Sequence, residues 1–392
     1  MRKKIYMDNA ATTPIKKEVL DEMLPYLTEN YGNPSSVYSL GSISKRAVED
    51  ARVKVGKALG ADRREIYFTG GGSEADNWAI KGVAYANVSK GNHIITTKVE
   101  HHAILHACEY LGKNGFDITY LDVDEYGLIN LEQLKESITD KTILISIMFA
   151  NNEIGTIQPI KEIGAIAKER NVYFHTDAVQ AIGHIEIDVK ELNIDLLSIS
   201  AHKFYGPKGI GALYIRNGVK IDSLIIGGGQ ERSRRAGTEN VPAIVGMGKA
   251  IELAYENVDE HNEKLIGLRD SLIEKIEKNI KHVRLNGHPT KRLPGNVNMC
   301  FKFIEGESLL LSLDMEGIAG SSGSACTSGS LDPSHVLLAI GLPHEIAHGS
   351  LRLSLGDFNT EEEIDYVVEK LEKIVDRLRM MSPLYEKAKG EI

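Results

Sequence analysis

Short apolar runs alternate with longer amphipathic segments along the first two thirds of the 392-residue chain. Helical patterns fall between many of the apolar runs, for example at 74–88, 102–113 and 160–170. This alternation predicts an α/β fold built on a seven-stranded, mostly parallel sheet. Several runs are apolar throughout, as in strands buried on both faces, and they lie at 66–69, 93–97, 116–121, 142–148, 172–176, 196–200 and 211–215.

The pattern changes after about Val241, where a long, helical and charge-rich segment continues to about Lys281. Two strand-like runs follow at 296–303 and 349–355, and a charged amphipathic helix is expected after Thr360. These features predict a smaller α+β domain at the C-terminal end. We place the large domain at 16–256 and the small domain at 1–15 and 257–392.

Composition and charge narrow the possible classes of protein. The chain is 42% hydrophobic and 26% charged, with a formal net charge of −9 and no dense basic block, which argues against a nucleic-acid partner. No run of about 18 apolar residues occurs, so no membrane span is expected. The basic start MRKK lacks the apolar stretch of a secretory signal. The three cysteines have no CxxC spacing, and we expect a cytoplasmic protein with reduced thiols and no metal site of its own.

A lysine follows the strand predicted at 196–200. There the sequence reads LLSISAHKFYGPKGIG, so the strand delivers His202 and Lys203 into a loop. A loop lysine is by itself most often a surface residue. However, Ser200 and His202 can donate hydrogen bonds to a phosphate, and the glycines that follow make a tight turn. The rival phosphate motif GxxxxGK[ST] is absent. Lys203 is therefore a candidate for holding a phosphorylated cofactor.

A carboxylate follows the strand predicted at 172–176. Asp177 lies where an unpaired charge is costly, and the protonated nitrogen of a pyridine ring would suit it as a partner. Gln180, three residues on, could donate to a phenolic oxygen of the same ring. Alternatively, Asp177 caps a following helix; the two roles are compatible.

Two further strand ends carry candidate residues. The segment FTGGGSEADN places Gly72 and Ser73 between a strand and a helix, where Ser73 is a plausible N-cap and the turn could receive phosphate. This signal is shared by many nucleotide-binding folds. His101 follows the next strand and could stack on a cofactor ring and act as an acid or base. The alternative is an ordinary surface histidine at a helix start.

Together these segments resemble the NifS/IscS-like cysteine desulfurases, class V aminotransferases of the fold-type I pyridoxal phosphate (PLP) enzymes. The resemblance is ordered and covers nearly the whole chain. It is carried by the motifs YMDNAATTP (6–14), YGNPSS (31–36), GSE (72–74), EH (100–101), NNEIG (151–155), HTD (175–177), SAHK (200–203), GGGQER (227–232), RAGTE (235–239), SSGSACTS (321–328) and SLRLS (350–354).

The resemblance implies a role for each matching residue. Lys203 is implied as the Schiff-base lysine of PLP, Asp177 as the partner of its ring nitrogen, Gln180 as a donor to its ring oxygen and His101 as the residue stacked on it. Thr238 is implied to reach the cofactor of a second subunit, which makes the protein an obligate homodimer. The remaining implied contacts are Gly72, Ser73, Ser200 and His202 to phosphate, Asn152 to cofactor or substrate, and Arg352 to the substrate carboxylate.

Cys326 lies in the small, polar segment GSACTSG, which predicts a thiol on a mobile loop. A free cysteine is more often buried and inert, and that description fits Cys108 and Cys300 better. The family reaction implies that Lys203 moves the Cα proton of L-cysteine, that Cys326 takes the sulfur as a persulfide and that alanine leaves. His101 is the candidate for handling the thiol proton.

The same resemblance implies where the sulfur goes next. The persulfide would pass to an iron–sulfur scaffold protein or another sulfur acceptor, with Cys326 a possible transient iron–sulfur ligand through its persulfide. Three alternatives remain open: a selenocysteine lyase, a small aminotransferase and a non-catalytic sulfur-trafficking scaffold. An aminotransferase has no need of Cys326. The intact set of Lys203, Asp177, His101, Cys326 and Arg352 argues against a scaffold.

Overall fold

A seven-stranded sheet forms the centre of the larger part of the molecule. The computed structural model describes residues 4–322, 333–383 and 385–386. The strand order is β2-β8-β7-β6-β5-β3-β4, and β8 is antiparallel to both neighbours while the other pairs are parallel. The expected α/β class and the mostly parallel sheet are confirmed. The strands are β2 (Ile66–Thr69), β3 (His93–Thr97), β4 (Asp117–Leu121), β5 (Thr142–Ser146), β6 (Tyr173–Asp177), β7 (Leu196–Ser200) and β8 (Gly211–Ile215).

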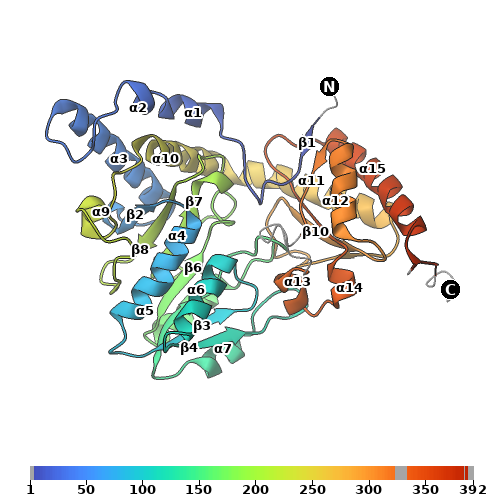
Figure 1. The fold of residues 1–392 in the computed structure, drawn as a ribbon, viewed down its shortest axis with the longest axis horizontal. Coiled ribbons are helices and arrows are strands. Elements are labelled where there is room, and N and C mark those ends of the chain that lie inside the picture. Colours follow the sequence, from blue (N-terminus) through green and yellow to red (C-terminus); the bar gives the residue numbers. More distant parts are fainter. Residues whose placement is uncertain (1–3, 323–332, 384, 387–392) are drawn as a thin grey trace.

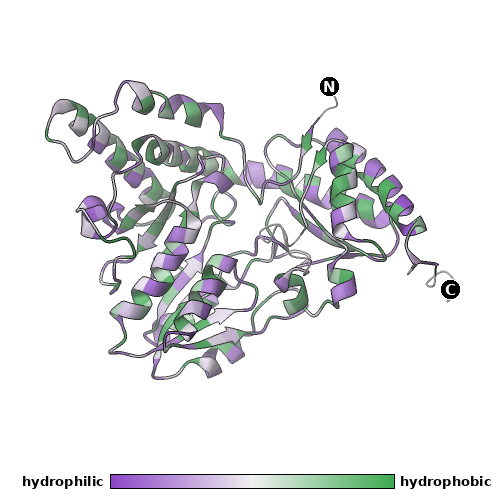
Figure 2. Cartoon of the chain, viewed as in Figure 1, coloured by the Kyte–Doolittle hydropathy of each residue, from purple (hydrophilic) through white to green (hydrophobic). Residues whose placement is uncertain are grey.

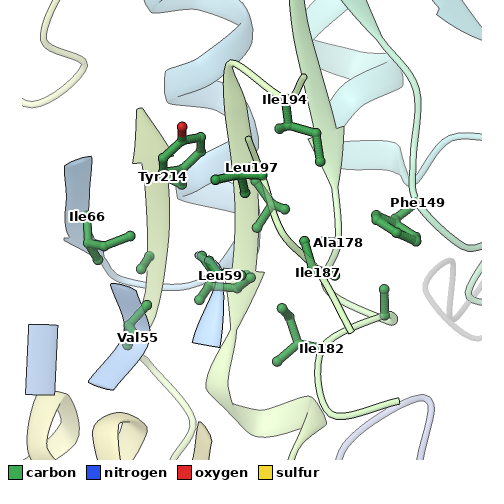
Figure 3. Close-up of a cluster of buried hydrophobic side chains, with 14 of the residues drawn as sticks. Val55, Leu59, Ile66, Phe149, Ala178, Ile182, Ile187, Ile194, Leu197 and Tyr214 are labelled. Carbon is green, nitrogen blue, oxygen red and sulfur yellow. The ribbon is translucent and has the colours of Figure 1, made fainter. Parts of the chain in front are cut away.

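Neighbouring residues of the central strands pack into different hydrophobic clusters on the two faces of the sheet. Ile94 and Leu196 pack on one face with side chains of α4 (Gly72–Asn77) and α6 (His102–Gly112). On the other face, the adjacent residues Ile95 and Leu197 pack with α3 (Ser39–Ala58), α8 (Ile160–Glu169) and α10 (Val241–Glu256). Figure 3 shows part of the cluster on this other face of the large sheet, including Leu197. Burial on both faces explains why these strands are apolar throughout.

The first helix after the sheet edge differs from the expectation. The pattern at 74–88 predicted one helix, whereas the chain forms α4, a π-helical turn (Trp78–Gly82) and α5 (Val83–Ala86). Ser73 is not the N-cap, because α4 begins one residue earlier and Gly71 caps it with φ 150° and ψ 179°. Only glycine adopts this backbone conformation readily, since it has no Cβ.

A second core lies in the C-terminal part of the chain (Figure 1). Its antiparallel sheet has the order β12-β10-β9, with β9 (Val283–Leu285), β10 (Asn296–Phe301) and β12 (Ser350–Ser354). Long helices pack on it, namely α11 (Val258–Asn279), α12 (Gly306–Met315) and α15 (Glu361–Met380). In Figure 2 these helices carry hydrophobic and hydrophilic residues in alternation along their length, as helices with one buried face do.

The N-terminal strand joins this second core. β1 (Ile5–Tyr6) pairs in parallel with β11 (Ile318–Ala319), and Ile5 and Met7 are buried in the same cluster. The division into a large domain (16–256) and a small domain (1–15 and 257–392) stays a prediction. The remaining helices are α1 (Lys17–Met23), α2 (Pro25–Thr28), α7 (Leu131–Ser137), α9 (Gln230–Ser233), α13 (His335–Ala339) and α14 (His344–Ala347). None of the helices in the described ranges has the length and apolar character needed to cross a membrane.

Candidate functional site

A cavity of about 380 Å³ lies at the carboxyl ends of the central strands. Its lining combines loops of the large sheet with the N-terminal segment and with β12 of the second core. Ten of the predicted site residues line it together: Gly72, Ser73, His101, Asn152, Asp177, Gln180, Ser200, His202, Lys203 and Arg352. Two predicted residues are not in this lining. Thr238 is exposed elsewhere on the chain, and Cys326 lies outside the described residues.

Lys203 ends a short 3-10 turn (Ala201–Lys203) that follows β7. Its Nζ donates hydrogen bonds to the carbonyl oxygens of Ala10 at 2.5 Å and Ala11 at 2.7 Å. Gln180 Nε2 donates to the same Ala10 carbonyl at 3.0 Å. The N-terminal segment therefore closes one wall of the cavity and orients the lysine. These two carbonyl groups had no predicted role, although they lie in the motif YMDNAATTP (6–14).

Asp177 is the last residue of β6 and is buried. Its Oδ1 accepts a hydrogen bond from the amide of Val179 at 2.9 Å. Turns rather than a helix follow it, so the helix-cap alternative is wrong. Burial raises the pKa of the Asp177 carboxyl to about 6, opposed by the Val179 amide and the Lys203 charge. A cation placed beside it would favour the ionised form.

A glycine-rich recess adjoins the cavity and shares Gly72, Ser73, Ser200 and His202 with it. Nothing lies within 4 Å of the position that a Gly71 Cβ would take, whereas a Cβ on Gly72 would come within 2.9 Å of Val179 Cγ2. Glycine at these positions leaves the backbone of the β2–α4 turn uncovered toward the recess. The recess therefore offers backbone and hydroxyl groups to an anion.

Two histidines of the cavity are uncharged at neutral pH. His101 caps α6, and its Nδ1 accepts a hydrogen bond from the Ala103 amide at 3.2 Å. Burial and then the Lys203 charge lower its pKa to about 4. Burial, followed by Lys203 and Lys208, likewise lowers the pKa of His202 to about 4. Because Nδ1 of His101 is an acceptor, its ring proton resides on Nε2.

Arg352 reaches the cavity from β12 and is buried. Its Nη1 donates to the backbone oxygen of Asn152 at 3.0 Å, and its Nη2 donates to Asp8 Oδ1 at 2.9 Å. Its Nε has no hydrogen-bond partner among the described residues. Two segments that are distant from β12 in sequence therefore hold the guanidinium group. Asp8 was missed as its partner, although it too belongs to the motif DNAATTP.

Three buried ionisable residues near the cavity had no role assigned from the sequence. Asp76 on α4 lines the cavity itself. Glu100 precedes His101, and burial raises its pKa to about 8. His175 lies two residues before Asp177 on β6, and burial lowers its pKa to about 3. Only His175 left a signal in the sequence, because it is a polar residue within the apolar run VYFHT.

The chain belongs to the aminotransferase class-V family, whose model matches residues 5–367. Among curated relatives, "Cysteine desulfurase IscS" of Clostridium botulinum (strain Hall) is 68% identical over 388 residues, covering 98% of both chains. The protein of the same name from Methanosarcina thermophila is 65% identical over 98% of this chain and 95% of that protein. The predicted family resemblance is therefore confirmed.

Solved structures show the same likeness. A NifS-like protein superposes with a TM-score of 0.91 at 41% identity, covering 96% of this chain and all of that one. A second structure, described as SspA in complex with cysteine, has a TM-score of 0.81 at 39% identity and covers 91% of this chain and all of that one. The fold described above is thus shared along almost the whole chain.

Proposed function

We propose that the chain is a PLP-dependent cysteine desulfurase, which takes sulfur from L-cysteine and releases L-alanine. The observation that carries this proposal is the convergence of three side chains on one cavity: Lys203 from the turn after β7, Asp177 from β6 and Arg352 from β12. Relatives at 65–68% identity over the whole chain are named cysteine desulfurases. A solved relative at 39% identity is described as being in complex with cysteine.

The residues of the cavity fit PLP. Asp177 is a buried carboxyl group that would pair with the ring nitrogen, and Lys203 would hold the aldehyde carbon. Gln180 would donate to the ring oxygen and His101 would lie against the ring face. The glycine-rich recess, with Ser73, Ser200 and His202, would take the phosphate. When bound, PLP supplies an electron-withdrawing ring that stabilises the negative charge left at a substrate carbon after its proton is removed.

The substrate end of the cavity is formed by Arg352 and Asn152. The guanidinium group, already fixed by Asp8 and the Asn152 carbonyl, would bind the substrate carboxylate. Bound there, the amino acid would present its Cα proton to the Lys203 amine, which acts as the base. The Ala10 and Ala11 carbonyl groups orient that amine in the free protein.

Sulfur transfer is assigned to Cys326. Its thiolate would attack the sulfur of L-cysteine, so that a new S–S bond forms while the bond between sulfur and the substrate Cβ breaks. The electron pair of the broken bond remains with the substrate carbon, which becomes the methyl group of alanine after protonation. Cys326 then carries the persulfide. The uncharged His101 is the group that would accept the thiol proton.

We also propose that the protein works as a homodimer in the cytoplasm and passes sulfur to an iron–sulfur scaffold protein or another acceptor. Thr238 is exposed and absent from the lining of its own chain's cavity, which suits a residue that contacts the cofactor of the neighbouring subunit. The segment of α1, α2 and the residues after them carries several exposed apolar side chains, which an interface between subunits would cover: Leu20, Leu24, Leu27, Tyr31, Val37 and Tyr38.

Replacement of Lys203 tests the assignment of the cofactor. Wild-type protein should show the yellow absorbance of covalently held PLP, and borohydride should fix the cofactor permanently to Lys203. Purified Lys203→Ala is expected to lack both properties. The exposed Lys220→Ala is the matched control and should keep both. A Lys203→Ala protein that still holds PLP in a borohydride-reducible linkage would overturn the proposal.

A further inference from the structure

A row of polar side chains lies on the face of the sheet that carries Asp177. His175 Nδ1 is 2.9 Å from Ser146 Oγ, and its Nε2 is 3.0 Å from Ser198 Oγ. All three residues are buried, and Ser198 is paired with Asp177 in the register of β6 and β7. Since residues two apart on a strand point to the same face, His175 and Asp177 share that face. The row therefore runs directly alongside the carboxylate proposed to face the cofactor.

Asp76 lies at the end of this row. It is 1% exposed, lines the cavity and places Oδ1 3.8 Å from His175 Nε2. Oδ1 has no hydrogen-bond partner among the described residues. The Ser198 hydroxyl interacts with the carboxyl group as well as with His175. Asp76 is thus a buried carboxyl group beside Asp177, in a place where the reaction assigns it no step.

The surroundings of Asp76 favour the uncharged form. Asp177 and Glu100 are acidic neighbours, and ionising more than one carboxyl group in this buried region is costly. Two cations line the cavity. Arg352 is paired with Asp8, and the charge of Lys203 favours the ionised form of Asp177. His175 supplies no charge, because both its ring nitrogens face hydroxyl groups and burial lowers its pKa to about 3. Burial and the Asp177 charge hold the pKa of Asp76 well above its usual range, against the opposing effect of the Ser198 hydroxyl.

We propose that Asp76 is a positioning residue of this site: an uncharged carboxyl group that ends the row Ser146–His175–Ser198 and leaves Asp177 as the single anion facing the cofactor. This inference rests on the proposed function. A second anion here would compete with Asp177 for the proton of the ring nitrogen and weaken the electron sink. A change at Asp76 should therefore alter kcat rather than KM, because the substrate carboxylate would be bound elsewhere, at Arg352 on β12.

Infrared spectroscopy tests the protonation of Asp76 directly. The carbonyl stretch of a protonated carboxylic acid is measured at pH 7 on wild-type protein and on Asp76→Asn, both with and without PLP. One component of this band should disappear in Asp76→Asn and persist in the exposed control Asp140→Ala. A band unchanged by Asp76→Asn would mean that Asp76 is ionised, and the inference would be wrong.

Kinetics test the positioning role. Asp76→Ala is expected to lower kcat for L-cysteine about tenfold, with KM within about twofold, as for the loss of one buried hydrogen-bonding group. Asp76→Asn, which keeps the shape and stays uncharged, should recover most of that loss. Equal losses in both variants, or a loss confined to KM, would contradict the inference. If Asp76→Ala does not fold, Ser198→Ala takes its place, because it removes the hydroxyl group that contacts the Asp76 carboxyl group. Asp76→Asn should then have a higher kcat than Ser198→Ala.

The two proposals fail in different ways. Wild-type protein that does not bind PLP or act on L-cysteine would count against the proposed function. In that case the infrared measurement on the cofactor-free protein still decides whether Asp76 is protonated. Wild-type protein that is active while Asp76→Ala matches it in kcat would refute only the role of Asp76.

Discussion

Arg352 shows how a single side chain joins distant parts of the sequence. Its guanidinium group is held by Asp8, 344 positions away, and by the carbonyl of Asn152, 200 positions away. Planar guanidinium geometry allows these two bonds while another donor remains for a substrate carboxylate. The motif SLRLS placed Arg352 in the site. Neither of its protein partners followed from the sequence, because local spacing says nothing about contacts between segments so far apart.

Replacement of Arg352 by lysine should affect the substrate more than the cofactor. We expect Arg352→Lys to raise KM for L-cysteine about tenfold or more, since a point charge loses bidentate recognition. The affinity for PLP should stay within about twofold. Steady-state kinetics and a PLP titration check this, with the exposed Arg377→Lys on α15 as the control. Equal losses of substrate and cofactor binding would contradict the proposed role of Arg352.

Glu100 makes the stability of the protein depend on pH. Its Oε1 accepts hydrogen bonds from Thr97 Oγ1 and the Met148 amide, and its Oε2 has no partner among the described residues. The carboxyl group has a pKa of about 8 in the folded chain, against 4.5 for an unperturbed glutamate. Between these values the folded state binds one proton more than the unfolded state. This group therefore lowers the stability as pH rises from about 4.5 to 8.

The variant Glu100→Gln removes this titration while keeping the oxygen that accepts both hydrogen bonds. We expect its free energy of unfolding without PLP to exceed that of wild type by more than about 1 kcal/mol at pH 8, with a much smaller difference at pH 4.5. Urea denaturation at the two pH values measures it, and Glu136→Gln on α7 is an exposed control. A gain of equal size at both values would refute the titration of Glu100.

At the scale of elements, the apolar runs predicted the sheet well because burial on both faces leaves a strong signal. The bounds predicted at 66–69, 93–97, 196–200 and 211–215 agree with β2, β3, β7 and β8. The antiparallel direction of β8 did not follow, since an apolar run does not specify its direction. The π-helical turn at Trp78–Gly82 was missed for a similar reason, because its apolar pattern is compatible with an ordinary helix.

The exposed apolar side chains on α1, α2 and the segment after them test the proposed homodimer. Leu27 is 56% exposed and Val37 is fully exposed. The double variant Leu27→Asp/Val37→Asp is expected to shift the mass in sedimentation from dimer to monomer. It should also weaken PLP binding, because Thr238 would no longer reach a neighbouring site. Met315→Asp on α12 changes a side chain that is 70% exposed and should leave the dimer intact. A wild-type monomer would contradict the proposal.

At the scale of the whole molecule, the site requires both hydrophobic cores. The large sheet positions Asp177 and Lys203, while the second core positions Arg352. The second core also holds β1, which leads to Ala10 and Ala11, whose carbonyl groups accept hydrogen bonds from Lys203. The ten predicted residues come from segments spread between Gly72 and Arg352, yet they line one cavity, and nothing in the short-range sequence pattern would bring these segments together. The ordered family resemblance supplied that information. Cys326 stays a prediction from the sequence, because it lies outside the described residues.

The two other cysteines make the sulfur-transfer step unusually easy to test. Cys108 and Cys300 are fully buried, and burial raises the pKa of their thiols to about 12 and about 11. Neither is a thiolate at neutral pH, and neither is open to a substrate, so neither is expected to act as the nucleophile. Any persulfide should therefore form on Cys326 alone.

The most direct test of the proposed function is a single turnover of the PLP-loaded protein with equimolar L-cysteine, followed by peptide mass spectrometry and measurement of alanine. We predict one alanine for each sulfur retained, with that sulfur found as a persulfide on Cys326, and neither product from Cys326→Ala. Alanine and sulfide formed at the wild-type rate by Cys326→Ala, or a persulfide on Cys108 or Cys300, would contradict the account.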